Sequence, residues 1–289
     1  MFKRVITLGS QPNSTFDLYI QHRLPVAKDI ELVQVNPWSD PKVFNRLSAK
    51  DSLVIINRYT SLRMMRWLRM NRNDIYKLLY VIDDDLTGML RASSVPTKNK
   101  VRPFQTRFLQ KQLLKIVDEV YVSTQALADV LGLKDAIVVP PLDDIQRTSA
   151  RKLDGQHMCY FAKMHRPEHD FLRPIVRDVL EQNPTARFTV IAGNSSLRKW
   201  QNMERVNVLP EQSLSGYRAF AANCNAGIFL IPLLDSKLNK CRSSAKRIEA
   251  VQMGAAPVFS DMPAYRDPRG KPYAGEVLVE NTAAAWTGI

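Results

Sequence analysis

Short apolar runs alternate with amphipathic stretches along the whole chain. Six runs rich in β-branched residues fill the first half, and the same alternation starts again in the second half. Continuous apolar runs of this kind are typical of parallel strands that are buried on both faces of a sheet. The pattern predicts an α/β protein with strands at 4–9, 31–36, 52–57, 77–83, 119–124 and 136–140, and again at 157–162, 187–193, 206–210, 226–233, 256–260 and 276–280.

Two of the intervening helices are predicted by their apolar spacing. In the stretch 124–132, Thr124 is the expected N-cap, Gly132 is the expected end, and Leu127, Val130 and Leu131 are expected to face inward. A longer amphipathic helix in the second half is indicated by Leu172, Ile175, Val176, Val179 and Leu180.

A polar stretch near the middle separates the two halves. Residues 140–145 and the polar residues 146–155 are typical of a linker, so we expect one domain over 1–145 and another over 146–289. The length of 289 residues suffices for two Rossmann-sized domains. Because ligands of such folds bind at the carboxyl ends of the strands, the expected site is a cleft across which the two domains face each other.

The stretch 239–261 completes a strand, helix and strand unit between two buried runs. Ser243 or Ser244 is the expected N-cap of its helix, and Gly254 is the expected end. The backbone N–H groups at such a helix start favour an anion such as phosphate. Helical spacing is shown by Ile248, Val251 and Gln252, and positive charge is supplied by Lys240, Arg242, Lys246 and Arg247.

This stretch resembles the donor-binding segment of GT-B nucleotide-sugar glycosyltransferases, above all those that build polysaccharides and lipopolysaccharides. The similar features are Lys246, Glu249 three residues later, a helix end of small residues, and Pro-Val-Phe-Ser before Asp261. The resemblance implies that the helix start holds the donor diphosphate and that Glu249 accepts hydrogen bonds from the ribose. Many members have a second Glu about two turns earlier, where this chain has Cys241. The alternative is that Lys246 and Glu249 form an ordinary exposed helix face.

The resemblance extends over nearly the whole chain. Residues 124–140 are similar to the segment that leads to the family's linker, and 160–193 to the first strand, helix and strand unit after it. Family members continue past the segment like 277–286 with helices that pack back on the N-terminal domain, whereas this sequence stops at Ile289. We expect either an unusually short member or a piece of a longer polypeptide.

Three consecutive carboxylates, Asp83, Asp84 and Asp85, follow a predicted buried strand. Adjacent like charges are unfavourable unless a cation, a helix start or a substrate offsets them. The first interpretation is a catalytic or acceptor-binding role, with one carboxylate acting as a base, and related GT-B sequences carry a similar motif. The second is metal binding, because Asp83 and Asp85 mimic the motif of GT-A transferases. The third is helix capping.

Residues 163–169 follow the first strand of the second half. Lys163 and Arg166 are candidate contacts to the donor phosphates. His165 and His169 are spaced like metal ligands, but no third ligand accompanies them, so we expect no metal site. The full set of predicted donor-binding residues is Lys163, Arg166, Ser243, Ser244, Lys246 and Glu249.

Composition narrows the class of protein and its partners. No apolar run approaches the roughly 18–20 residues that span a bilayer, and the three cysteines Cys159, Cys224 and Cys241 lack metal-ligand spacing, which favours the reducing cytoplasm. The net charge of +13 requires an acidic partner. An anionic membrane surface is one candidate, whereas nothing except charge suggests nucleic acid. A dinucleotide cofactor is not expected, since Gly-x-Gly-x-x-Gly does not follow the first strand.

The sequence therefore predicts a metal-independent GT-B glycosyltransferase that uses no cofactor. Its expected substrates are a nucleotide-sugar donor and a glycan or lipid-linked acceptor, in bacterial surface polysaccharide synthesis. The expected location is the cytoplasm or the inner face of the membrane. The alternative is a non-catalytic α/β module that binds nucleotides or sugar phosphates within a larger protein.

Overall fold

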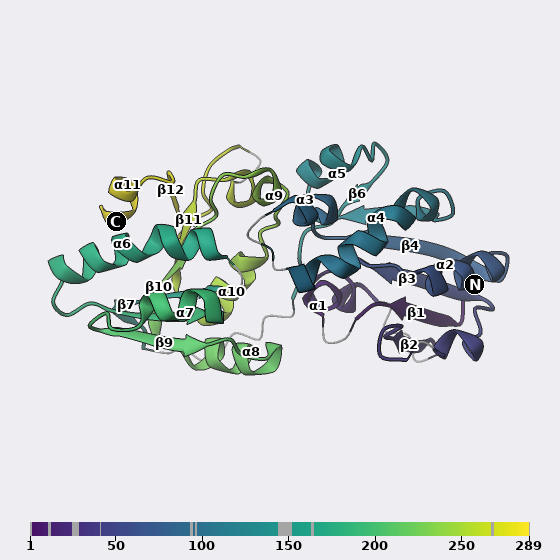
Figure 1. The fold of residues 1–289 in the computed structure, drawn as a ribbon, viewed down its shortest axis with the longest axis horizontal. Helices are drawn as coiled ribbons and strands as arrows, with labels where there is room; N and C mark the ends of the chain where they lie inside the picture. Colours follow the sequence, from purple (N-terminus) through teal and green to yellow (C-terminus); the bar gives the residue numbers. More distant parts are fainter. Residues whose placement is uncertain are drawn as a thin grey trace. The chain divides into compact units, whose positions relative to one another are not determined.

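The computed structural model describes residues 2–10, 13–24, 29–40, 42–92, 95, 97–143, 152–162, 165–266 and 269–288. It divides into two compact units (Figure 1). The first comprises Met1–Asp143 and Cys241–Ser243, and the second comprises Asp144–Lys240 and Ser244–Ile289. The expected boundary after residue 145 falls among residues 144–151, outside the described residues, and it stays a prediction.

The described part of the first unit contains a six-stranded parallel sheet in the order β2-β1-β3-β4-β5-β6. Leu8, at the carboxyl end of β1, lies opposite Val35 of β2 and Ile56 of β3. Its strands are β1 (Arg4–Leu8), β2 (Glu31–Val35), β3 (Ser52–Asn57), β4 (Ile75–Ile82), β5 (Glu119–Val122) and β6 (Ile137–Val138). Its helices are α1 (Ser14–Tyr19), α2 (Leu62–Met70), α3 (Leu86–Arg91), α4 (Val101–Leu113) and α5 (Gln125–Leu131), with 3₁₀ turns at Gln21–Arg23, Val43–Asn45 and Thr97–Lys100.

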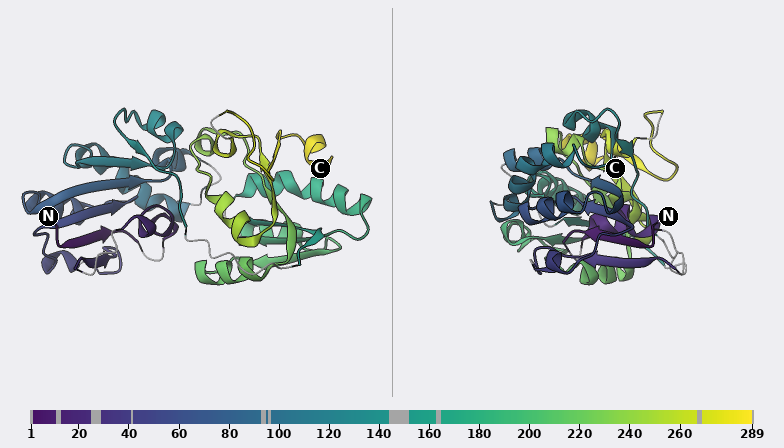
Figure 2. Two further views of the ribbon diagram at one scale, coloured as in Figure 1. Left: turned by 180° about the vertical axis from the view of Figure 1, so that it is seen from behind. Right: turned by 90° about the vertical axis from the view of Figure 1, so that its right-hand side faces the viewer.

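Alternating strand side chains build a core on each face of this sheet. Ile56 and Tyr80 belong to the core that α2, α4 and α5 cover. Ile55 and Val81 belong to a smaller core on the opposite face, with Phe16 of α1. Seen from behind, the strands lie in front of α2 and α4 (Figure 2, left). Helices α2 and α4 thus share one face of the sheet.

The described part of the second unit also contains a six-stranded parallel sheet, in the order β12-β11-β10-β7-β8-β9. Its strands are β7 (Asp154–Ala162), β8 (Arg187–Ala192), β9 (Val206–Pro210), β10 (Ala226–Ile231), β11 (Ala256–Ser260) and β12 (Val277–Val279). Its helices are α6 (Arg166–Gln182), α7 (Asn194–Trp200), α8 (Leu214–Asn223), α9 (Lys237–Lys240), α10 (Ala245–Met253) and α11 (Ala283–Thr287), with a 3₁₀ turn at Pro263–Tyr265.

Helices cover both faces of this second sheet. Tyr160 and Phe188 pack with α6, α7 and α11 on one face. Phe161 and Phe229 pack with α8 and α10 on the other. Numbered from β7, the strand order is 3-2-1-4-5-6, which is the Rossmann order. The strand connections therefore reverse direction between β7 and β10, where folds of this class bind their ligands.

The α/β prediction is confirmed, and each of the twelve expected strands is present with its ends shifted by at most three residues. Thr124 caps α5 by accepting from the backbone N–H of Leu127, and Gly132 ends the helix with a φ of 66°. The expected inward position of Val130 is wrong: its side chain is 58% exposed, and Ala128 is buried instead.

Candidate functional site

The first candidate cluster lies at the carboxyl end of β7, beside the reversal of strand order. Lys246, in the first turn of α10, donates to the backbone oxygen of Phe161 at 2.9 Å. Its Nζ also lies 2.6 Å from Oε2 of Glu249. The two residues that the sequence singled out on this helix are therefore an ion pair at the edge of the sheet where a ligand is expected.

Tyr217 of α8 holds the same carboxylate oxygen, and its hydroxyl lies 3.4 Å from Nζ of Lys246. Its hydroxyl donates to Oε2 of Glu249, and Nζ of Lys246 lies 5.4 Å from the centre of its ring. Burial, and then the charge of Glu249, raise the pKa of Tyr217, so the phenol stays protonated and keeps donating. Within the described part of the chain, Oε1 of Glu249 forms no hydrogen bond. One carboxylate oxygen is thus held by two donors, whereas the other has no partner among the described residues.

The start of α10 is at Ser244, one of the two expected caps. Among the described residues, the Ser244 side chain forms no capping hydrogen bond. Gly254 ends the helix with a φ of 71°, as the sequence predicts. The buried face consists of Ala250 and Met253, whereas Val251 is 53% exposed. The uncapped helix start leaves backbone N–H groups that could donate hydrogen bonds to an anion.

The cations around this helix are less available than the sequence suggests. Each of the four is paired with a carboxylate, and this neutralises much of their charge. The pairs are Lys240 with Asp235, Arg242 with Asp84, Lys246 with Glu249, and Arg247 with Glu276. These cations therefore orient carboxylates within the fold, and the pairing reduces the charge that they could offer to a bound anion.

Of the remaining predicted donor contacts, Lys163 lies outside the described residues. Arg166 begins α6, where its side chain is 60% exposed and lies 3.8 Å from Asp170. Of the two histidines singled out in the sequence, His169 is buried within the fold. Its Nδ1 accepts from the indole N–H of Trp200 at 3.0 Å, and its Nε2 lies 2.8 Å from the oxygen of Ala162. No group of three metal-ligating side chains occurs among the described residues.

Glu168 is a positioning residue that the sequence analysis did not single out. It is buried in the first turn of α6 and accepts from Asn239 at 2.9 Å and from the backbone N–H of Leu234 at 3.4 Å. Burial opposes its ionisation, but His165 lowers the pKa of the carboxyl below its usual value. Glu168 therefore fixes the segment that leads toward α10. An acidic residue in the first turn of a predicted helix was the available signal.

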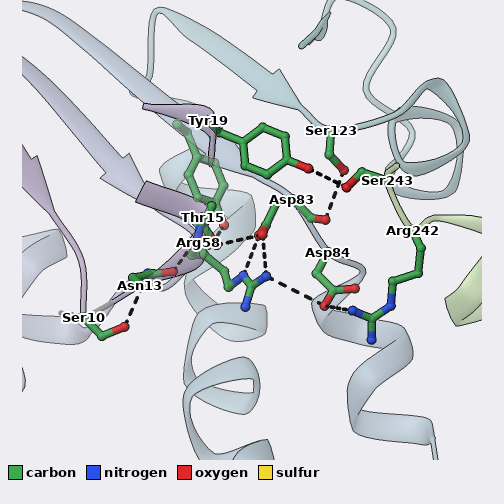
Figure 3. A network of polar contacts seen from close by, with 11 residues as sticks. Ser10, Asn13, Thr15, Tyr19, Arg58, Asp83, Asp84, Ser123, Arg242 and Ser243 are labelled. Atoms are coloured by element: carbon green, nitrogen blue, oxygen red, sulfur yellow. Dashed lines mark hydrogen bonds and ion pairs between the residues drawn. The ribbon is translucent and has the colours of Figure 1, made fainter. Parts of the chain in front are cut away.

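The second candidate cluster is the acidic triplet at the carboxyl end of β4 in the first unit. Figure 3 shows two of its members, Asp83 and Asp84, with their partners. Asp83 is bound on both oxygens by Arg58, at 2.5 Å each, and Thr15 donates to it at 2.7 Å. Burial opposes the charge of Arg58, but Asp83 and Asp84 raise its pKa, so the guanidinium is permanently charged. Arg58 also has a φ of 62°, in the left-handed region that non-glycine residues rarely adopt.

Asp84 is the most deeply placed of the three carboxylates. It is 3% exposed, and its Oδ2 lies 3.3 Å from Arg242 and 3.8 Å from Arg58. Within the described residues, its Oδ1 and the Nε of Arg242 are buried without a hydrogen-bond partner. Such groups are unfavourable unless something satisfies them. Asp84 is therefore the member of the triplet with an unused acceptor.

Asp85 has a structural position. Its Oδ1 accepts from the backbone N–H of Gly88 at 2.8 Å, so it is the N-cap of α3. A Cβ at Gly88 would lie 2.2 Å from Oδ2 of Asp85, which explains the glycine. Helix capping, one of the three interpretations of the triplet, thus applies to this member.

Two further groups complete the surroundings of the triplet. Burial, and then Asp83, raise the pKa of Tyr19, whose hydroxyl donates to Ser243 at 2.5 Å. Cys241, near the expected position of a second Glu, is fully buried, and burial together with Asp85 and Asp84 raises its thiol pKa to about 11. A buried neutral thiol cannot take over the sugar contact of a carboxylate.

The sequence matches no protein-family model and no curated protein sequence. Several solved structures are similar to this chain in fold. The S. aureus protein TarM has a TM-score of 0.60 at 14% identity, over 85% of this chain and 49% of that chain. The pneumococcal O-GlcNAc transferase GtfA, in complex with UDP and GlcNAc, has a TM-score of 0.55 at 15% identity, over 85% of this chain and 51% of that chain. This chain has the GT-B fold.

The fold is shared with proteins of different lengths. An alpha-glucosyltransferase in complex with UDP and a 13-mer DNA has a TM-score of 0.55 at 10% identity, over 89% of this chain and 78% of that chain. The present chain spans about half the length of TarM and GtfA. None of the described helices combines the length and apolarity required to cross a membrane.

Proposed function

We propose that this protein is a glycosyltransferase that moves a sugar from a nucleotide-activated donor to a glycan or lipid-linked acceptor in bacterial surface polysaccharide synthesis. It acts in the cytoplasm, with an anionic membrane surface as a further partner, and needs no metal. Support comes from the GT-B fold and from the ion pair of Lys246 and Glu249 at the carboxyl end of β7. The single observation that carries the proposal is this pair.

The donor site follows from the chemistry of that pair. The Glu249 oxygen without a partner in the described residues would accept a ribose hydroxyl, while Tyr217 and Lys246 hold the other oxygen in place. The uncapped start of α10, with Ser243 and Ser244, would take the diphosphate. Arg166, exposed at the start of α6, and Lys163 are the proposed additional phosphate contacts.

The catalytic step needs a group near the acceptor hydroxyl that can accept its proton. Asp83, Asp84 and Asp85 are the proposed source of that group. Asp84 is favoured because Asp83 is bound by Arg58 and Asp85 caps α3. Positive charge and helix dipoles can stabilise a leaving diphosphate without a metal.

The test is nucleotide binding by the whole chain. UDP, GDP, dTDP and CMP would be screened by thermal shift, because a ligand that binds only the folded state raises the unfolding temperature. Lys246→Ala and Glu249→Ala should each lower the affinity for the nucleotide that binds best by about one to two decades. The reason is that a charge-assisted hydrogen bond contributes roughly 1.5–3 kcal/mol.

A matched control is the exposed ion pair of Arg177 and Glu181 on α6. Arg177→Ala and Glu181→Ala should leave nucleotide affinity unchanged. Equal affinity in the Lys246 and Glu249 variants and in these controls would remove the donor-site assignment.

A second candidate function is a non-catalytic module that binds nucleotides or sugar phosphates. It is favoured by Cys241, which is buried near the position where many GT-B transferases have a sugar-side Glu. Nucleotide binding without donor hydrolysis or transfer to any glycan acceptor would support the module and contradict the transferase.

A further inference from the structure

The net charge of the chain is concentrated in two stretches. Residues 52–73 and 86–117 carry twelve of the 41 Lys and Arg residues and none of the 28 Asp and Glu residues. The other 29 basic residues are therefore almost balanced by acidic ones. Helices α2 and α4 lie inside these two stretches. Whatever acidic partner the net charge requires should meet this part of the first unit.

The cations on these helices are available at the surface. Arg63 and Arg66 of α2 and Arg107 and Lys111 of α4 are exposed. Among the residues that the structure describes, none of these four side chains forms an ion pair or hydrogen bond, in contrast to the four cations around α10. Surface cations that have no carboxylate partner are the ones that attract an anionic surface.

Exposed apolar side chains lie on the same two helices. Leu62 and Met70 of α2 are 75% and 73% exposed, and Phe104 and Phe108 of α4 are 55% and 64% exposed. The two rings contact each other, with centroids 4.8 Å apart. Phe104, Arg107, Phe108 and Lys111 share one face of α4 by their spacing of three, four and seven residues. Positive and apolar groups are thus interleaved.

The two helices present one continuous surface. Arg69 of α2 donates to Gln112 of α4 at 2.7 Å, and both helices cover the same face of the sheet (Figure 1). Between them lies an open groove of about 570 Å³, lined by Leu62, Met65, Arg66, Arg69, Met70 and Leu109 among others. Apolar patches of this kind mark interaction sites.

We infer that the exposed face of α2 and α4 binds an anionic lipid membrane surface. Phe104, Phe108, Leu62 and Met70 enter the boundary between headgroups and acyl chains, while the arginines keep their charge at the phosphates. A nucleic acid fits less well, because it binds through phosphate contacts and base stacking, and aliphatic side chains such as Leu62 and Met70 gain nothing from either. The inference deepens the proposed function by naming the surface that meets the membrane.

The test is co-sedimentation of the full chain with vesicles of phosphatidylcholine alone or mixed with phosphatidylglycerol. We expect binding to the mixed vesicles that weakens in high salt, because surface charges are screened. Each cation near an anionic membrane contributes about a fivefold increase in partitioning. The variant Arg63→Gln/Arg66→Gln/Arg107→Gln should therefore bind about a hundredfold more weakly. Phe104→Ala/Phe108→Ala should also bind more weakly than the parent, and high salt should abolish the binding that remains, because only the attraction between charges is left.

The matched control is Lys134→Gln/Lys152→Gln/Arg198→Gln, which removes the same charge from exposed positions outside α2 and α4. It should bind within a few-fold of the parent. The inference would be overturned if both triple variants lost binding equally, or if the arginine variant bound like the parent. It would also be overturned if the protein bound single-stranded RNA in place of vesicles. Because UDP binding is measured separately, failure here leaves the donor site untouched, and failure of the donor site leaves vesicle binding intact.

Discussion

Asp83, Asp84 and Asp85 are adjacent in sequence, yet each has a different environment. Arg58 and Thr15 bind Asp83, and the helix start of α3 binds Asp85. Only Asp84 retains a buried oxygen without a partner in the described residues. The same residue type therefore serves as a salt-bridge partner, as a candidate reactive group and as a helix cap.

Replacement by Asn separates these roles. Asp84→Asn should lower transfer by about 10²–10⁴-fold, because the proton-accepting charge is lost. Nucleotide affinity should stay within a few-fold of the parent. Asp85→Asn is the matched control, since Asn caps helices as well as Asp does, and it should keep both activity and stability. Near-parental transfer rates in Asp83→Asn, Asp84→Asn and Asp85→Asn alike would show that the triplet is purely structural.

The sequence predicted the triplet as a site but not this division of roles. A run of carboxylates after a buried strand is visible in the chain, whereas the partners Arg58 and Thr15 are 25 and 68 residues away from Asp83. Glu249 is a similar case, because its partner Tyr217 comes from another helix. Contacts of this kind depend on the tertiary fold, which a local pattern does not contain.

At the scale of elements, helix ends were predicted better than helix faces. Thr124, Gly132 and Gly254 act through their own backbone geometry, so a local signal is enough. Val130 and Val251 are apolar but exposed, because short helices bury a narrow face that is set by their neighbours.

Helices α6 and α7 are joined by a hydrogen bond that depends on pH. The neutral ring of His169 accepts from Trp200, and burial lowers its pKa. In the unfolded chain the ring regains a pKa of about 6.5. As the pH falls below that value, the unfolded state binds the extra proton first, so the free energy of unfolding decreases. This stabilisation is complete above about pH 6.5 and is lost in acid.

His169→Gln tests this assignment, since Gln can accept from Trp200 and donate to Ala162 without titrating. The unfolding temperature of the parent should fall more than that of the variant between about pH 7.5 and pH 5.5. His157, whose pKa is also lowered by burial, titrates in both proteins and cancels in the comparison. Equal slopes would assign the acid sensitivity to other groups.

For the molecule as a whole, the two-part α/β architecture was predictable because twelve apolar runs each form a strand. The grouping of Cys241–Ser243 with the first unit could not be predicted, because these three residues between a strand and a helix carry no local signal for it. The same is true of the surface on α2 and α4. The sequence shows clusters of basic residues, and only the structure shows which of them lack carboxylate partners.

Transfer or donor hydrolysis should keep its rate in EDTA. Arg58 and Thr15 occupy the oxygens of Asp83, and Asp85 caps α3, so the Asp83 and Asp85 pair is not arranged for a divalent ion. The helix start of α10 would stabilise the diphosphate instead. The measurement is the rate with EDTA and after addition of Mg²⁺ or Mn²⁺. Loss of turnover that either ion restores would make Asp83 and Asp85 metal ligands.

The uneven distribution of charge also determines how the protein behaves on a chromatographic resin. An isoelectric point of about 9.7 suggests a uniformly cationic particle, but most of the excess comes from residues 52–73 and 86–117. A cation exchanger therefore retains the molecule through one region, while the remaining surface is close to electroneutral. Elution is then governed by the arginines of α2 and α4, and two variants of identical net charge leave the column at different salt concentrations according to where the charge was removed.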